Sequence, residues 1–177
     1  MRAARSAAPL VAVLLLAAGC RDDDADARDE RSDEPTRLVV TTADGTERTL
    51  TDVTATCIPS DYDPKVQVVR VSGELDGGGV FAEVLPADVE GGRSYDMPVP
   101  AGSDETGPEN AIVVVGIEPD LTNTSEQEES TGTLEVLRAS CDPVEVELTI
   151  DGTLDSEYYD GEPVDVEGRL VFPAPAG

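Results

Sequence analysis

Apolar and polar residues alternate in short runs along most of the chain after residue 36. The clearest run is residues 144–150, in which Val, Val, Leu and Ile alternate with Glu, Glu and Thr. A period of two indicates a β-strand with one buried and one wet face. Residues 112–115 are Ile followed by three Val, a run typical of a central strand.

Turn residues separate these runs. Asp44-Gly45 is a strong hairpin signal, Pro59 ends one apolar run, and residues 77–79 are three glycines. We expect strands in the following segments: 38–41, 50–58, 66–73, 80–85, 112–115, 134–139, 144–150 and 164–172, with a further short strand near Tyr95. No segment of the domain has convincing helical periodicity. The pattern predicts an all-β fold, an antiparallel β-sandwich of about eight or nine short strands.

Two long stretches interrupt the strand pattern. Residues 86–110 contain only the short segment near Tyr95, and residues 118–131 are polar throughout. Loops of this length in a compact domain are usually functional or mobile, and their composition does not say which. Asn123-Thr124-Ser125 matches a glycosylation sequon, which we interpret as a chance match.

The chain carries 38 acidic and 12 basic residues, a net charge of −26, and Lys65 is its only lysine. Such a field repels nucleic acid phosphates and anionic lipid headgroups, and it keeps copies of the chain apart. We therefore expect a monomer without a nucleic acid partner. This charge is equally consistent with a protein from a salt-adapted source and with an ordinary well-solvated surface.

The N-terminus has the features of an export signal. Arg2 and Arg5 precede residues 6–20, which contain no charge and are too few for the roughly 18 or more apolar residues of a spanning helix. An uncleaved signal anchor or a buried first helix is the alternative. The end of this run, Ala17-Ala18-Gly19-Cys20, resembles the lipobox of bacterial lipoprotein precursors, although Ala17 stands where Leu is commonest.

The resemblance covers only the first twenty residues, and it implies three segments. Residues 1–19 would be a lipoprotein signal peptide, and residues 20–36 a lipidated Cys20 followed by an acidic tether that is expected to be disordered. Residues 37–174 would form the single β-sandwich domain. A cysteine carrying fatty acyl chains such as palmitate would anchor the protein to the cell membrane or outer membrane, outside the cytoplasm, because two chains suffice for stable anchoring.

With Cys20 acylated, Cys57 and Cys141 remain as an even pair in an oxidising compartment, for which a disulfide is the default. Two separately buried thiols are the alternative. The segments that end at these cysteines, residues 50–57 and 134–141, align without a gap, and with five residues inserted in the first copy residues 71–76 match 150–155. This self-similarity leaves both duplication and coincidence open.

The sequence contains no recognisable catalytic motif. Without histidine the chain has no Ser-His-Asp or Cys-His nucleophile and no histidine-ligated zinc. The densest group of carboxylates consists of four residues: Asp155, Glu157, Asp160 and Glu162. Because these oxygen ligands lie in a loop with a turn glycine, the loop is a candidate calcium site. The spacing of the carboxylates does not match an EF-hand, and a solvated loop is the favoured interpretation.

We expect a non-enzymatic, lipid-anchored module that binds a protein or small molecule at the cell envelope, without a resident cofactor. A carboxylate-based, calcium-dependent envelope enzyme is the first alternative. A passive charged coat or spacer protein is the second. The partner cannot be named from these residues.

Overall fold

The computed structural model describes residues 35–61, 63–85, 87, 89, 92–99, 110–117, 121–157 and 161–173. These residues form antiparallel strands and no helix, so the expected all-β class is confirmed. Among them we find no helix with the length and apolarity needed to cross a membrane. The strands are β1 Arg37–Thr41, β2 Glu47–Thr49, β3 Thr51–Pro59, β4 Gln67–Leu75, β5 Gly78–Leu85, β6 Arg93–Asp96, β7 Asn110–Ile117, β8 Leu121–Thr124, β9 Thr131–Cys141, β10 Val144–Ser156 and β11 Val164–Phe172.

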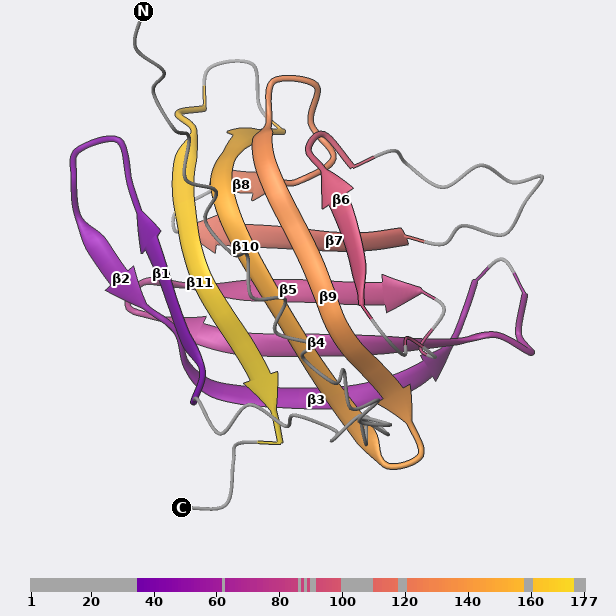
Figure 1. Ribbon diagram of the computed structural model, residues 1–177. Coiled ribbons are helices and arrows are strands. Elements are labelled where there is room, and N and C mark those ends of the chain that lie inside the picture. Colours follow the sequence, from indigo (N-terminus) through magenta and orange to yellow (C-terminus); the bar gives the residue numbers. More distant parts are fainter. Residues whose placement is uncertain are drawn as a thin grey trace, which may run out of the picture. The chain divides into compact units, whose positions relative to one another are not determined.

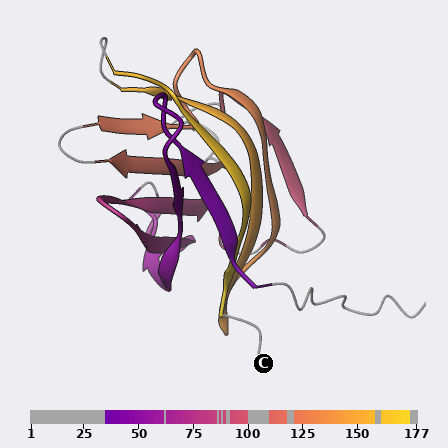
Figure 2. The same ribbon diagram turned by 90° about the vertical axis from the view of Figure 1, so that its left-hand side faces the viewer.

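The strands form two layers that cross at a steep angle (Figure 1). Sheet A has the order β2-β1-β11-β10-β9-β6, and sheet B has the order β8-β7-β5-β4-β3. The view turned by 90° shows sheet A curving around one side of sheet B (Figure 2). This is the orthogonal arrangement of two packed sheets.

The layers are joined at two corners, which nearly close the sheet into a barrel. At one corner β10 leaves sheet A, and its last residues, Asp155 and Ser156, pair with β8 of sheet B. At the other corner the chain passes from β2 through Leu50 into β3, where the register shifts and Asp52 has a φ of 50°. Gly73 is needed here, because an added Cβ would lie 2.6 Å from Leu50 Cδ1.

The core lies between the layers and is built from valine, leucine and isoleucine. Its largest fully buried side chains include Leu134, Leu148 and Leu154 from sheet A and Val71 and Val84 from sheet B. Alternate residues of β7 are buried, which is the pattern of a strand with one face on a core. The predicted alternation in residues 144–150 is confirmed: Val146, Leu148 and Ile150 are buried.

The hairpin predicted at Asp44-Gly45 is present between β1 and β2. Gly45 takes a φ of 82°, which glycine adopts without strain. The Asp44 carboxylate accepts hydrogen bonds from the Thr42 hydroxyl at 2.6 Å and the Thr46 amide at 3.0 Å. These bonds lower the pKa of Asp44 to about 2, the Thr42 hydroxyl contributing most.

Two strands were not foreseen. The short β2 follows the first hairpin, and β8 lies inside residues 118–131, which were expected to be a polar loop. That expectation is wrong for residues 121–124 and 131, and the short strand near Tyr95 is confirmed as β6. Thr36, the last residue of the expected tether, contacts the domain: its hydroxyl donates to the Val171 carbonyl and accepts from the Val171 amide, both at 2.9 Å.

The proposed duplication maps onto two hairpins, β3–β4 and β9–β10. Cys57 lies opposite Val69, twelve residues later, whereas Cys141 lies opposite Val144, three residues later. The insertion of five residues that aligned the sequences does not account for this difference in register. The two hairpins therefore do not superpose residue for residue in that alignment.

Candidate functional site

The predicted disulfide is present. Cys57 near the end of β3 is bonded to Cys141 at the end of β9, with 5.8 Å between the Cα atoms. The bond ties the last strand of sheet B to sheet A across 84 residues of sequence. Cys20 lies outside the described residues, so its acylation stays a prediction.

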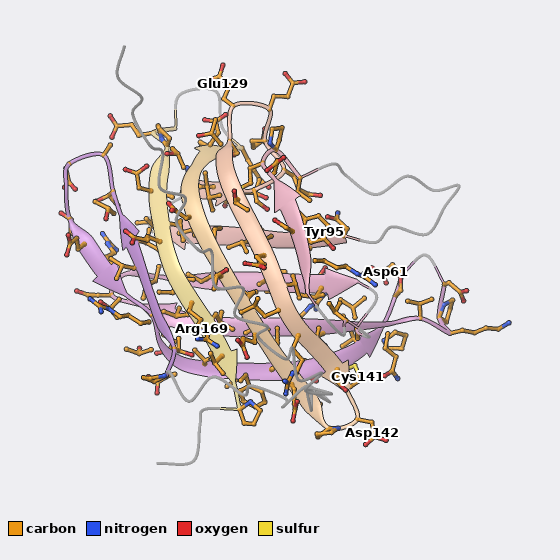
Figure 3. All side chains as sticks on the ribbon, in the orientation of Figure 1. Asp61, Tyr95, Glu129, Cys141, Asp142 and Arg169 are labelled. Atoms are coloured by element: carbon orange, nitrogen blue, oxygen red, sulfur yellow. A yellow bond between two sulfur atoms is a disulfide. The ribbon has the colours of Figure 1, made fainter. Side chains whose placement is uncertain are left out.

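A shallow, open depression of about 560 Å³ lies beside the disulfide. Its lining comes from the β3–β4 connection (Lys65, Val66), from Gln67 and Ala87, and from the β9–β10 turn (residues 140–142). Figure 3 shows Cys141 and Asp142 at this end of the molecule and Glu129 at the other. The sequence does not predict this depression, because its lining residues come from three separate segments of the chain.

Lys65 and Asp142 bring opposite charges to the depression, and both side chains are exposed. The Lys65 backbone amide donates to the Asp63 carboxylate at 3.0 Å, which fixes the turn that carries the lysine. Asp142 is the only carboxylate among the described lining residues, whereas hydrolysis of a glycoside uses a facing pair. The depression offers a contact surface of mixed polar and apolar character.

The three described carboxylates of the calcium candidate, Asp155, Glu157 and Glu162, do not form a group that could hold a metal ion. Asp155 lies in β10 and pairs with Thr124, Glu157 follows the strand, and Glu162 precedes β11. Asp160 lies outside the described residues. Within the described ranges no three acidic or cysteine residues are close enough to hold a metal ion.

Residues at the end of β8 and just after it form a buried polar cluster that the sequence pattern did not reveal. Asn123 is fully buried, and its amide donates to the carbonyls of Leu154 at 3.2 Å and Glu162 at 3.0 Å. The Ser130 hydroxyl donates to the Thr124 carbonyl and accepts from the Asp155 amide, both at 2.8 Å. The Asn123 side chain of the sequon therefore has a structural role, because its amide is buried and hydrogen-bonded within the protein.

Glu126 lies beside this cluster, because its backbone amide donates to the Thr124 hydroxyl at 3.4 Å. Partial burial raises its pKa, and the nearby carboxylates of Glu157 and Glu83 raise it further. A hydrogen bond from the Asn110 side chain opposes these effects. Glu126 and Glu157 thus form a small acidic pair beside the predicted calcium loop, which sequence spacing alone did not connect.

Charge is unevenly distributed between the surface and the half-buried layer. Two basic residues are exposed in the described chain, Arg37 and Lys65. The exposed acidic residues there number sixteen. They are Asp44, Glu47, Asp52, Asp61, Asp63, Glu74, Asp76, Asp96, Glu128, Glu129, Asp142, Asp151, Glu157, Glu162, Asp165 and Glu167.

Several arginines are held in contacts within the protein. Arg70 pairs with Glu83 at 2.5 Å and lies 5.2 Å from the centre of the Phe81 ring. Other pairs join neighbouring strands of sheet A: Arg138 with Glu145, and Arg169 with Glu147. Figure 3 places Arg169 on β11. These pairs neutralise arginine locally and leave the outer surface negative.

Comparisons with known proteins identify no relative of the chain. No family model, curated protein or solved structure matches the chain. The function is therefore argued from the residues and contacts described above.

Proposed function

We propose that the chain is a lipid-anchored binding module on the outer side of a bacterial membrane. In this proposal Cys20 holds the protein at the bilayer, and the β-sandwich engages a partner through its surface, without catalysis. The observation that carries the proposal is the unequal exposure of charge: among the described residues, sixteen acidic residues are exposed and only two basic ones, Arg37 and Lys65.

This distribution favours a cationic partner. Fixed negative charge on one protein steers positively charged groups toward it and repels nucleic acid, anionic headgroups and other copies. The Cys57–Cys141 disulfide supports the compartment, because disulfides persist mainly in oxidising environments. The lipobox resemblance of residues 17–20 supports the anchor.

Metabolic labelling tests the anchor. A bacterium that produces the wild-type chain is grown with an alkyne fatty acid, and the purified protein is examined for the label. We expect label on the wild-type chain and none on Cys20→Ala, with Cys57 and Cys141 disulfide-bonded in both. An unlabelled wild-type chain recovered from the cytosol would overturn the proposal.

One observation favours a second candidate, a calcium-dependent role at residues 155–162. Glu126 lies near Glu157 and adds a carboxylate to this region. Calcium bound only by the native state would raise the melting temperature as its concentration rises. A rise with calcium that magnesium does not reproduce, and that Glu157→Gln abolishes, would favour this candidate over the binding module.

A further inference from the structure

Strand β3 is an open edge of sheet B. In the described chain it pairs with β4 alone, and it is the terminal strand of the sheet order. None of its nine residues is buried, whereas β4 beside it buries five of nine. An edge strand of this length presents a row of backbone donors and acceptors to solvent.

The register identifies which groups face outward. The Ser60 amide donates to the Val66 carbonyl at 2.8 Å, so this opposed pair is hydrogen-bonded. In an antiparallel ladder bonded pairs recur at every second residue, so Ile58, Thr56 and Thr54 bond to β4. The backbone groups of the alternate residues, Val53, Ala55 and Cys57, point away from β4.

The outward row lacks the features that normally protect a sheet edge. Residues 53–58 contain no charge and no proline, although 28% of the whole chain is charged. Natural edges are usually protected by lysine, proline, bulges or inward-pointing charges. Here the bulge and Asp52 lie at the start of the strand and Pro59 at its end, which leaves the middle open to pairing.

Carboxylates lie at both ends of this open stretch. Asp52 is exposed at the start, and exposed Glu74 lies on β4 opposite Thr51. Asp61 and Asp63 are exposed just beyond the other end, and Figure 3 shows Asp61 on that connection. The edge is therefore uncharged in the middle and has an excess of carboxylates at its ends, where Lys65 lies in the same connection as Asp61 and Asp63.

We propose that β3 binds an extended peptide segment of a partner protein by strand addition, with lysine or arginine at both ends of the segment. The inference rests on the proposed binding function and specifies its surface. Main-chain hydrogen bonds to residues 53, 55 and 57 would supply affinity, and the terminal cations would set specificity. A second copy of the chain is disfavoured as the occupant, because each copy carries a net charge of −26.

The side chains of β3 also set a pattern for the partner. Val53, Ala55 and Cys57 are half-buried and pack against the core, whereas Thr54 and Thr56 are exposed. An added strand continues both faces of the sheet, so its residues should alternate between apolar and polar. The synthetic peptide KKTVTVTVTKK has this pattern, and EETVTVTVTEE is its charge-reversed counterpart.

Binding is measured on the full chain in nonionic detergent, using Ala55→Pro and Ala55→Ser. Proline removes one outward N–H without removing a bond to β4, and it is tolerated on edge strands, whereas serine keeps the N–H. We expect the lysine peptide to bind wild type and Ala55→Ser equally and Ala55→Pro about tenfold more weakly. The glutamate peptide should not bind, and 1 M NaCl should weaken binding of the lysine peptide because it shortens the Debye length to about 3 Å.

Amide hydrogen exchange on wild type provides a test that needs no variant. Residues 53, 55 and 57 should exchange fast in the free chain and slowly with the lysine peptide, while residues 54, 56 and 58 stay protected throughout. Slow exchange at residues 53, 55 and 57 in the absence of peptide, as in a dimer paired at β3, would overturn the inference. Equal affinity of Ala55→Pro and Ala55→Ser for the lysine peptide would also overturn it. If Cys20 is labelled and the peptide does not bind, the inference fails while the proposed anchor stands.

Discussion

Glu126 is the residue whose ionisation opposes the fold most clearly. Burial and two neighbouring carboxylates raise its pKa above the model-compound value of 4.5. The folded state therefore holds this proton more tightly than the unfolded state does. The stabilisation is fully present below pH 4.5 and is lost as the pH rises through the higher pKa of the folded state.

Removing this carboxylate should consequently stabilise the protein at neutral pH. We expect Glu126→Gln to raise the melting temperature by about 2 °C at pH 7.5 and by less at pH 4. Glu128→Gln, at an exposed position two residues away, is the matched control and should change little at either pH. A Glu126→Gln variant less stable than wild type at pH 7.5 would show that the charged form supports the fold.

Gly152 allows β10 to lie close to the backbone of β9. It lies opposite Gly132 on β9, and an added Cβ would be 2.1 Å from the Thr131 carbonyl oxygen and 2.4 Å from Met97 Cε. Because the nearest obstacle is backbone, Gly152→Ala should destabilise the protein by about 1–3 kcal/mol. Gly116→Ala on β7, where an added Cβ meets nothing within 4 Å, should change stability by less than about 0.5 kcal/mol. Chemical denaturation of both variants checks this, and equal stabilities would contradict the role of Gly152.

At the scale of elements, the disulfide is the longest-range constraint on the strands. On the chain-entropy relation, a link across 84 residues stabilises the fold by about 4.5 kcal/mol. We expect Cys57→Ala/Cys141→Ala to lose about 2–5 kcal/mol in guanidinium unfolding, without a change in the β-sheet signal in the absence of denaturant. Two free thiols per mature wild-type chain in a thiol assay would contradict the bond itself.

The strands that sequence patterning located best are those with one face on the core. The alternation in residues 144–150 predicted β10, because burial of one face imposes a period of two. The continuous apolar run at residues 112–115 predicted β7. β8 escaped detection because two of its buried residues are polar: the Asn123 amide donates to the distant Leu154 and Glu162 carbonyls, and the Thr124 hydroxyl accepts from the Glu126 amide. Hydrophobic patterning does not register a strand stabilised in this way.

The candidate surfaces could be predicted only in part. The pairing of Cys57 with Cys141 followed from cysteine counting, and the structure contains it. The open edge of β3 depends on strand order, which nothing in residues 51–59 specifies. The closeness of Glu126 to Glu157 depends on the corner that joins β8 to β10. Non-local pairing of this kind lies beyond single-sequence patterns.

At the scale of the whole molecule, the main energetic feature is self-repulsion. Sixteen exposed acidic residues face two exposed basic ones in the described chain, so unfolding separates like charges. Salt screens this repulsion, and the Debye length falls from about 30 Å at 0.01 M to about 10 Å at 0.1 M. We expect the melting temperature to rise with NaCl over this range. A fall would indicate that the ion pairs of Arg70, Arg138 and Arg169 outweigh the net charge.

We propose that Cys20 anchors this acidic β-sheet protein outside the cytoplasm. The most direct test is the mass of the N-terminal peptide of the mature chain isolated from membranes of a bacterium that produces it. We predict a peptide that begins at Cys20 and carries fatty acyl chains, with residues 1–19 absent. A peptide that retains residues 1–19 with a free Cys20 thiol would contradict the account.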